Sequence, residues 1–478
     1  MQITQYENTG FKILERGGSV LEDTIAAVGT VPGESGIGIV RLSGSLSIEI
    51  LEKIFESKKW KSAYDIPSRY MTYGYIFDDE DNKVDEVLAV IMRAPYSYTA
   101  EDVVEIHCHG GIVPIRKIIG LTLNKGARLA EAGEFTKRAF LNGRIDLAQA
   151  EAVIDVITAK TEGGLGNALN QLGGALSQQI KEIMSILISI LAHIEASIDF
   201  PEHDIEEVTL ENVKNNTRIA KDYIIDLLNT YDEGKIQREG LSTAIVGRPN
   251  VGKSSLLNVL LKENRAIVTD IPGTTRDIIE EYLNLGGILL KLIDTAGLRE
   301  TEDIVEKIGV ERTKQAIDKV DLIIFVIDTS EKLTKEDWDI ISLTKGKKVI
   351  VVGNKIDLGI KADLEEIKRI FGKDNIVEMS IKEYKGIKEL EKAIVDIVYS
   401  GNVESKNTSL ISNVRHKYLL EKAQYSLDKA EEAIEAGIPV DLISVDIKDA
   451  WRYLGEITGD TVEEDIITEI FSRFCIGK

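Results

Sequence analysis

The chain has 478 residues, which at roughly 150 residues per domain is about three domains rather than one hydrophobic core. Apolar residues make up 43% and charged residues 29% of the chain, values that exclude a disordered or fibrous protein. The 58 Lys and Arg against 80 Asp and Glu give a net charge of −22, which disfavours a large nucleic-acid-binding surface but allows a local basic patch.

The cysteines and the apolar segments bear on the cellular compartment. Cys108 and Cys475 lie far apart in the sequence, so neither a disulfide framework nor a zinc ribbon is predicted. Met1–Gly18 lacks the apolar core of a secretory signal. The longest apolar run lies within Ile183–Ala192 and is too short to span a bilayer. We therefore expect a cytoplasmic protein without a membrane segment.

The N-terminal third has a mixed pattern. Residues 1–22 show no clear periodicity and are expected to be an N-terminal extension. Residues 23–141 alternate β-type runs with helical ones, which predicts an α+β domain. The predicted strands are Ile37–Leu42, Val87–Met92 and Val103–His107, and the predicted helices are Ser47–Phe55 and Val113–Lys125.

Residues 142–240 are predicted to form the first part of a helical domain. Their apolar residues recur at three- and four-residue spacing, as in Ile183, Leu187, Ile190, Leu191 and Ile194. Glycines interrupt this pattern and are expected to mark a helix junction or close helix packing. They are Gly163, Gly164, Gly166, Gly173 and Gly174.

Residues 241–400 change to β-branched runs that are each followed by a helical stretch, which is typical of a doubly wound parallel sheet. The predicted strands are Thr243–Gly247, Leu289–Asp294, Leu322–Asp328, Val349–Asn354 and Ile376–Met379. Helical periodicity returns over Leu419–Ala436 and Asp446–Gly455. Residues 401–478 are therefore predicted to be the second part of the helical domain, into which the α/β domain is inserted.

The strongest motif is the G-x-x-x-x-G-K-S loop at residues 247–254, which follows a predicted strand and opens a predicted helix. Its glycines let backbone N–H groups converge on phosphates at a helix N-terminus. Lys253 is expected to reach the β- and γ-phosphates, and the Ser254 hydroxyl to bind Mg²⁺.

Three further motifs follow in chain order and predict a GTPase. Asp294-Thr295-Ala296-Gly297 ends a strand and supplies a carboxylate to the Mg²⁺ shell and an N–H near the γ-phosphate. Asn354-Lys355-Ile356-Asp357 places a carboxylate where it can accept from guanine N1–H and N2–H₂, donors that adenine lacks. Ser380-Ile381-Lys382 follows the last strand as a loop behind the base.

The sequence also departs from the commonest GTPase pattern. Leu298 stands where a Ras-like enzyme has its water-positioning Gln, so hydrolysis must be assisted differently. Asn250 in the phosphate loop has an amide oxygen that is suited to a monovalent cation. Residues 269–277 (TDIPGTTRD) offer hydroxyls and carbonyls in a compact switch. The residues predicted to bind GTP are Asn250, Val251, Gly252, Lys253, Ser254, Ser255, Thr269, Asp270, Ile271, Pro272, Gly273, Thr274, Thr275, Asp294, Thr295, Ala296, Gly297, Asn354, Lys355, Asp357, Ser380, Ile381 and Lys382.

With these motifs the chain resembles the MnmE (TrmE) family of tRNA-modifying GTPases from Asp23 to its end. The resemblance extends beyond the G motifs to both flanks. The matching segments are GRPNVGKSSLLN, TDIPGTTRD, DTAGLRE, NKID, GIGIVRLSG, YTAEDVVEIHCHGG, GEFTKRAFLNGRIDLAQAEA and the terminal FCIGK. One departure is Ile381, where the family more usually has Ala.

The resemblance implies a homodimer formed through an N-terminal domain with the fold of tetrahydrofolate-dependent aminomethyl carriers. It implies a helical domain that carries the inserted G domain, and K⁺ acting in place of an arginine finger. In this chain K⁺ would be held by Asn250, Thr269, Ile271 and Thr274, and Thr275 would join Ser254 on Mg²⁺. Glu306 would orient the attacking water; without the family match, a solvated helix carboxylate would be the preferred interpretation.

The resemblance also implies a site for 5-formyl-tetrahydrofolate or a related folate. Arg41, Glu105, Arg144 and Lys478 match the family's contacts, and Cys475 matches its functional thiol. His107-Cys108-His109 resembles a metal cluster, but on a strand the two histidines point away from the cysteine. Metal binding there is therefore not favoured.

The function implied is a K⁺-dependent GTPase that acts with the flavoprotein MnmG (GidA) to build a carboxymethylaminomethyl group at C5 of wobble uridines in tRNA. The alternative is an RNA-binding ribosome-assembly GTPase of the Era or EngA type. Those proteins carry a basic KH-type module after the G domain, whereas this chain is acidic and helical there and has no G-x-x-G loop. The acidity predicts weak tRNA affinity for this chain alone, with the partner supplying most of the phosphate contacts.

Overall fold

The computed structural model describes residues 23–31, 33–199, 206–264, 281–293, 317, 320–399 and 410–478. These residues form two compact units. One unit is drawn from residues up to 154, 172–221 and 422–478, and the other from residues 155–171 and 222–421. Each unit combines pieces of more than one predicted domain, and the domain boundaries stay predictions.

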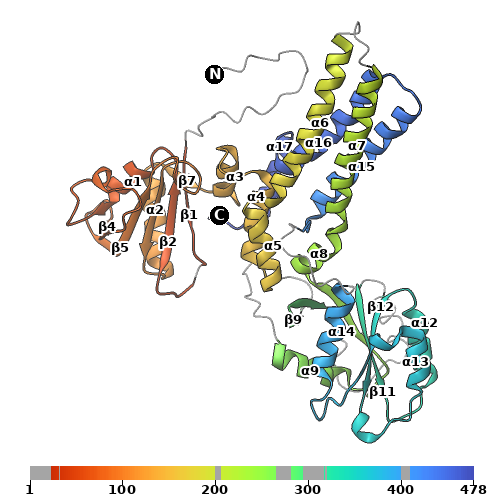
Figure 1. The fold of residues 1–478 in the computed structure, drawn as a ribbon. Helices are drawn as coiled ribbons and strands as arrows, with labels where there is room; N and C mark the ends of the chain where they lie inside the picture. The colour runs from red at the N-terminus through yellow and green to blue at the C-terminus, as the bar shows by residue number, and fades with distance from the viewer. Residues whose placement is uncertain are drawn as a thin grey trace. The chain divides into compact units, whose positions relative to one another are not determined.

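The first unit contains a seven-stranded sheet with the strand order β3-β4-β5-β6-β2-β1-β7 (Figure 1). β1 pairs in parallel with β7, and the other neighbouring strands are antiparallel. The strands are β1 (Thr24–Val28), β2 (Gly38–Ser43), β3 (Phe55–Glu56), β4 (Thr72–Phe77), β5 (Lys83–Met92), β6 (Val103–Cys108) and β7 (Ala127–Leu129). Helices α1 (Ser47–Ile54) and α2 (Ile112–Asn124) pack on one face of this sheet.

Side-chain alternation decides which residues of this sheet reach its other face. Val40 and Leu42 of β2 are fully buried in the core shared with α1 and α2. Arg41 lies between them and therefore points to the opposite face. The register pairs Arg41 with Glu105 of β6, whose neighbours Val104 and Ile106 are in the same core. The two charged side chains thus lie side by side on the face opposite the helices.

The elements predicted in this region are confirmed to within a few residues, and the structure adds four strands. β5 begins four residues earlier than predicted, because its first residues, Lys83–Glu86, are mostly charged and give no apolar signal. β1, β3, β4 and β7 were not predicted. Three of these have five residues or fewer, and β4 contains Gly74, which interrupts its β-type pattern.

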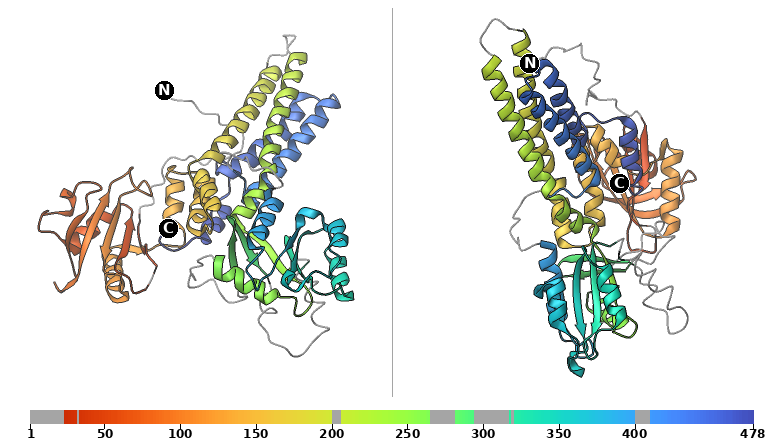
Figure 2. Two further views of the ribbon diagram at one scale, coloured as in Figure 1. Left: turned by 60° about the horizontal axis from the view of Figure 1, so that its bottom comes forward. Right: turned by 90° about the vertical axis from the view of Figure 1, so that its right-hand side faces the viewer.

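Helices make up the rest of the first unit, and some of them continue into the second unit. They are α3 (Glu134–Leu141), α4 (Leu147–Thr158), α6 (Ala175–Asp199), α7 (Glu206–Asn229), α15 (Val414–Glu435), α16 (Val440–Thr458) and α17 (Glu464–Ser472). The predicted periodicity is confirmed in α6, where Ile183, Leu187, Ile190 and Ile194 are all buried. α6 packs along α16 (Figure 2). Lys221 of α7 bridges Asp428 and Glu431 of α15. No helix in the described ranges is long and apolar enough to cross a membrane.

The second unit contains a six-stranded sheet with the strand order β13-β12-β11-β8-β10-β9. Five strands are parallel, and β9 pairs antiparallel with β10 at the edge. The strands are β8 (Leu241–Val246), β9 (Glu281–Leu285), β10 (Ile288–Leu292), β11 (Leu322–Asp328), β12 (Lys348–Asn354) and β13 (Ile376–Glu378). The five predicted strands are confirmed. β9 was missed because an edge strand of alternating polar and apolar residues lacks the continuous apolar run of the others.

Both faces of this sheet are covered, as expected of a doubly wound fold (Figure 1). α9 (Lys253–Asn264) and α14 (Ile387–Tyr399) pack on one face. α12 (Lys335–Leu343) and α13 (Leu364–Phe371) pack on the other. All seven residues of the central strand β11 are therefore buried.

The second unit also includes α5 (Glu162–Leu172) and α8 (Tyr231–Glu239), the helix that leads into β8. Gly164 of α5 packs against α8 so closely that a Cβ there would lie 2.6 Å from the Gln237 carbonyl oxygen. Arg238 of α8 donates to Asp155 at 2.8 Å. The expectation of close helix packing is confirmed at Gly164, and Gly173 and Gly174 form the junction between α5 and α6.

A buried arginine ties α3 to the start of the described chain. The Arg138 side chain is fully buried and donates to the Asp23 carboxylate at 2.8 Å and to Glu134 at 3.0 Å. It also pairs with Glu101 at 3.3 Å. Burial alone would raise the pKa of Glu134, but the hydrogen bonds from Arg128 and Arg138 outweigh it and hold that pKa below its usual value.

We expect Arg138→Met to lower the free energy of unfolding by about 3 kcal/mol, because the mostly buried Glu101 and Glu134 lose a fully buried cation that pairs with both. Arg473→Met, which breaks an exposed ion pair with Glu469 on α17, is the matched control and should cost about 1 kcal/mol or less. Urea unfolding at neutral pH measures both.

The same experiment has a pH dependence. A carboxyl whose pKa is lowered by folding contributes stability above its unfolded pKa, and this contribution disappears as the pH falls through the folded value. The difference between the wild type and Arg138→Met should therefore shrink below pH 4.5, the ordinary value for Glu134. A difference that grows on acidification would contradict this assignment.

Candidate functional site

The phosphate loop joins β8 to α9, and its backbone requires glycine at two positions. Gly247 has a φ of 152°, and a Cβ there would lie 2.3 Å from the Val326 carbonyl oxygen. Gly252 has a φ of 107°, and a Cβ there would lie 2.4 Å from the Asn354 Nδ2 atom. Asn250 adopts a left-handed conformation with a φ of 63°. The loop can therefore pass close to β11 and β12.

Lys253, the first residue of α9, lies inside the turn of this loop. Its Nζ atom donates to the carbonyl oxygens of Gly247 and Arg248, each at 2.8 Å. Burial lowers the pKa of Lys253, and among the described residues no carboxylate forms an ion pair with it. Ser254 and Ser255 follow, exposed, in the first turn of the helix. A partly buried cation beside a helix N-terminus is the arrangement that binds a phosphate.

The Asn354-Lys355-Ile356-Asp357 motif is bonded directly to the phosphate loop. The buried Asn354 amide donates to the Val251 carbonyl at 2.8 Å and accepts from the Ile381 N–H at 3.2 Å. The Lys355 Nζ atom donates to the Asn250 carbonyl at 2.9 Å. These bonds place the phosphate loop, the end of β12 and the Ile381 loop next to one another.

Asp357 is oriented by the loop that follows β13. It is exposed, and its Oδ1 atom accepts from the Ser380 hydroxyl at 2.7 Å. Ile381 is buried and would lie 3.5 Å from a Cβ on Gly252. Lys382 is exposed. An exposed carboxylate that is oriented in this way can accept hydrogen bonds from the base of a nucleotide.

Sequence reasoning missed Asp328 at the end of β11. Its carboxylate pairs with Lys355 at 2.6 Å and accepts from the Ser330 hydroxyl at 2.6 Å. Burial would raise the pKa of Asp328, but these contacts hold it below the usual value. The signal was its position, because a carboxylate at the C-terminal end of a parallel strand lies at the edge of the sheet where ligands bind.

The remaining predicted GTP-site residues lie outside the described residues. They are Thr269, Asp270, Ile271, Pro272, Gly273, Thr274, Thr275, Asp294, Thr295, Ala296, Gly297 and the predicted water-positioning residue Glu306.

A second cluster of predicted residues lies in the first unit. The Arg41 Nε atom donates to Glu105 at 2.8 Å, and its Nη2 atom lies 2.7 Å from the same oxygen. Both side chains are mostly buried, which differs from the surface charge that the sequence alone suggested for Arg41. The Arg41 guanidinium also lies 5.7 Å from the ring centres of Tyr98 and Phe135.

The C-terminus completes this cluster. Arg41 Nη1 donates to the Gly477 carbonyl at 3.3 Å, and Ile476 forms an isolated bridge with Ala132. Gly477 has a φ of 92°, and a Cβ there would lie 2.5 Å from the Val28 carbonyl oxygen, so only glycine fits. Burial and the nearby Arg41 charge lower the pKa of Lys478. Arg41 and Lys478 are two cations beside the Glu105 carboxylate, and cations of this kind can hold an anionic ligand.

Arg144 joins the cluster through Tyr98. Its guanidinium lies 4.7 Å from the Tyr98 ring centre, and the Tyr98 hydroxyl is 2.9 Å from the Thr136 hydroxyl. Tyr98 therefore stands between the two arginines. Sequence reasoning missed it, although it opens one of the matching segments. Together these contacts bring Arg41, Glu105, Arg144 and Lys478 into one region of the first unit.

The two cysteines differ in environment. Cys475 is exposed next to this cluster. Cys108 is buried, its thiol donates to the Gly38 carbonyl at 3.3 Å, and burial raises its pKa to about 11. The flanking histidines have carboxylate neighbours, His107 with Glu105 at 3.4 Å and His109 with Asp85 at 2.7 Å.

Comparison with known proteins gives matches along nearly the whole chain. The family described as GTP-binding protein TrmE N-terminus matches residues 24–144, and the MnmE helical domain matches residues 147–475. The tRNA modification GTPase MnmE of Alkaliphilus metalliredigens is 55% identical over 459 residues, covering 96% of this chain and 100% of that relative. The protein of the same name from Geobacillus thermodenitrificans is 52% identical over 458 residues, covering 95% and 99%.

Solved structures resemble part of the chain. The G-domain of FeoB from Methanococcus jannaschii is 25% identical, covers 33% of this chain and 97% of its own, and has a TM-score of 0.25. The G domain of T. maritima FeoB is 28% identical, covers 33% and 98%, and has a TM-score of 0.24. These TM-scores are too low to add to the assignment, which follows from the family matches and the relatives.

We expect Asp357→Asn to weaken GDP binding about 100-fold, because two hydrogen bonds from guanine to a carboxylate are lost. The asparagine amide should instead favour xanthine, which has a carbonyl where guanine has its amino group. Titration with labelled GDP and XDP measures both affinities. Asp374→Asn, which changes an exposed carboxylate elsewhere in the same unit, is the control and should change neither. An unchanged preference for guanine in Asp357→Asn would show that this carboxylate does not read the base.

Proposed function

The chain belongs to the MnmE family of tRNA modification GTPases, and from that premise we propose that it is a K⁺-dependent GTPase acting on wobble uridines. With the flavoprotein MnmG it would install the carboxymethylaminomethyl group at C5, using a one-carbon unit bound to tetrahydrofolate. The observation that carries the proposal is the bonded unit of the phosphate loop and the Asn354–Asp357 motif. It supplies the phosphate-binding and base-reading groups that GTP requires.

The residues of the nucleotide site that the structure describes are suited to Mg²⁺ and K⁺. Ser254 lies in the first turn of α9, where a hydroxyl can bind Mg²⁺ beside the phosphates, and Thr275 is proposed to join it. Asn250 is exposed, and its backbone is held by the Lys355 hydrogen bond. Its amide oxygen is therefore available for K⁺, together with Thr269, Ile271 and Thr274. When bound, K⁺ would supply the positive charge that neutralises the transferring phosphoryl group.

Glu306 is proposed to position the water because it matches the water-orienting glutamate of the family, whereas Leu298 has no group that could orient a nucleophile. A carboxylate can do so by accepting a hydrogen bond from the attacking water or from a second water between them. Lys253 would leave the loop carbonyls that it now contacts and pair with the phosphates, because burial makes its uncompensated positive charge costly.

The cluster around Arg41 supports a folate site. Arg41, Arg144 and Lys478 are suited to the carboxylates of a folate glutamate tail, and Glu105 to the donor edge of a pterin. Arg41 and Glu105 are already held in a fixed relation by their own ion pair. Cys475 is exposed beside them and is proposed to act in the modification chemistry. The protein would act in the cytoplasm as a homodimer bound to MnmG, and tRNA would be held mainly by that complex.

We expect GTP turnover to rise strongly when Na⁺ is replaced by K⁺ at constant ionic strength, and Asn250→Ala to abolish that increase. The physical reason is that Asn250 would supply one of the oxygen ligands to the ion. Asn258→Ala, an exposed position of α9 outside the loop, is the matched control and should keep the increase. Phosphate release in the two salts measures the effect, and equal wild-type turnover in both would overturn the K⁺ dependence.

The pathway has its own test. In cells that lack this protein, mass spectrometry of tRNA nucleosides should show wobble uridines without the carboxymethylaminomethyl group. The wild-type gene should restore the modification, and a Lys253→Ala variant should not, because it lacks the phosphate-binding cation. Unchanged wobble uridines in the deletion strain would refute the assignment.

A further inference from the structure

A basic and aromatic surface lies at the β3 edge of the N-terminal sheet. Residues 57–73 contain four basic, one acidic and four aromatic residues, in a chain whose net charge is −22. They connect the edge strand β3 to β4, and Tyr96 from the loop after β5 lies against them. We call this the aromatic-basic surface; it consists of Lys58, Lys59, Trp60, Lys61, Tyr64, Arg69, Tyr70 and Tyr96.

The members of this surface hold one another in place. The Lys59 Nζ atom donates to the Tyr70 hydroxyl at 2.7 Å and lies 5.2 Å from the Trp60 ring centre. The rings of Trp60 and Tyr70 meet edge to face with centres 6.1 Å apart. Arg69 donates to the Tyr96 carbonyl at 3.0 Å, and its guanidinium lies 5.7 Å from that ring centre. These contacts pre-arrange two groups of cations and rings on the surface, one around Tyr70 and one around Tyr96.

Three of the four aromatic side chains of this surface are exposed, and the fourth, Trp60, is half-buried against the core of the sheet. Tyr96 is 73% exposed and Tyr64 is 54% exposed. Three of the eight exposed tyrosines in the described parts of the chain belong to this surface and a fourth, Tyr73, ends the same segment, whereas the other four are spread over α7, α15 and the loop after β13. A cluster of exposed aromatic rings marks a binding surface rather than part of a core.

The composition of the surface indicates the kind of partner. Aromatic residues and arginine are common at protein–protein interfaces, but lysine is depleted there, and this surface contains three lysines. Single-stranded nucleic acids are bound by both features together, with cations along the phosphates and exposed rings stacked on bases. The surface therefore fits an unpaired nucleic acid strand better than a protein.

We propose that the aromatic-basic surface binds unpaired nucleotides of an RNA. The choice of RNA rests on the proposed function in tRNA modification, whereas the fit to an unpaired strand rests on the side chains alone. With four cations the surface makes only a few phosphate contacts. The affinity of this chain alone is then weak, with a salt dependence no steeper than about −3 in log K against log salt.

The test measures binding of the full-length chain to a labelled oligouridine of about 12 nucleotides, which is within the site sizes of single-strand binding proteins. Lys59→Glu with Lys61→Glu removes charge, and Tyr64→Ala with Tyr96→Ala removes stacking while keeping the backbone carbonyls that accept from Arg93 and Arg69. Each pair should weaken binding about tenfold or more. The lysine pair should also lower the salt slope by about 1.4.

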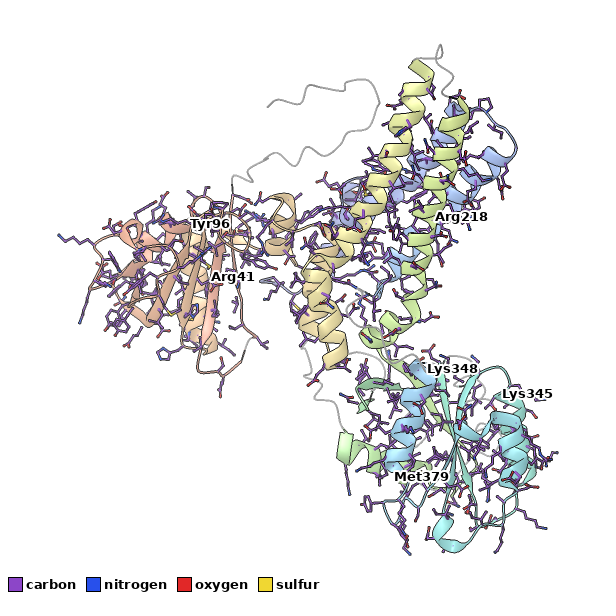
Figure 3. All side chains as sticks on the ribbon, viewed as in Figure 1. Arg41, Tyr96, Arg218, Lys345, Lys348 and Met379 are labelled. Carbon is purple, nitrogen blue, oxygen red and sulfur yellow. The ribbon has the colours of Figure 1, made fainter. Side chains whose placement is uncertain are left out.

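Lys345→Glu with Lys348→Glu is the matched control. Both lysines are exposed in the second unit and make no ring contact with any described residue, and Figure 3 labels them together with Tyr96. This pair makes the same change in charge as the Lys59 and Lys61 pair and should alter the oligouridine affinity less than twofold. Thermal unfolding followed by circular dichroism checks that every variant is folded.

Three results would overturn the proposal. They are an equal loss of affinity in the control pair, unchanged binding in both surface variants, and equal affinity of the wild type for a double-stranded RNA of the same length. Unchanged binding would leave an acidic protein as the partner of this surface. The wobble-uridine measurement does not depend on this surface. If cells that lack the protein keep a normal modification pattern while the surface variants lose oligouridine binding, the proposed function is overturned and the surface proposal stands.

Discussion

The nucleotide site depends on two hydrogen bonds that link the phosphate loop to the end of β12. Asn354 donates to the Val251 carbonyl and Lys355 donates to the Asn250 carbonyl. The first bond explains Gly252, because a Cβ at that position would collide with the Asn354 amide. The second is reinforced by Asp328, which neutralises the same lysine. The Asn354–Asp357 motif and the phosphate loop are thus hydrogen-bonded to each other directly.

The Arg41 cluster is assembled from segments far apart in the sequence, with the Glu105 carboxylate and the Gly477 carbonyl both accepting from one guanidinium. The neighbouring Arg138 network fixes α3 through the carboxylates of Asp23, Glu101 and Glu134. α3 in turn supplies Phe135, over which the Arg41 guanidinium lies. The Arg138 network therefore positions the Arg41 cluster through α3. In both, removing one charged partner leaves charge that is less well compensated.

The net charge of −22 describes the chain as a whole and says little about any one surface. Residues 145–240 contain seven basic and 17 acidic residues, whereas residues 112–144 contain seven basic and two acidic ones. Part of that basic segment is neutralised, because Arg138 is buried among carboxylates, whereas the aromatic-basic surface is exposed at the edge of the N-terminal sheet. A net charge of −22 can therefore coexist with a local basic surface on the same chain.

The sequence by itself determined the order of the motifs, the strands that carry them and the helical periodicity on both sides of the G domain. These features are local, because a phosphate loop or an apolar repeat is written in consecutive residues. Only the tertiary structure decided that Asp328 neutralises Lys355, that β9 closes one edge of the second sheet, and that the C-terminal residues lie against Arg41. Sheet register brings Arg41 and Glu105 together across 64 residues, and a hydrogen bond from the Arg41 side chain reaches the Gly477 carbonyl across 436 residues. Such pairings depend on the packing of the whole unit, so no local pattern in the sequence reveals them.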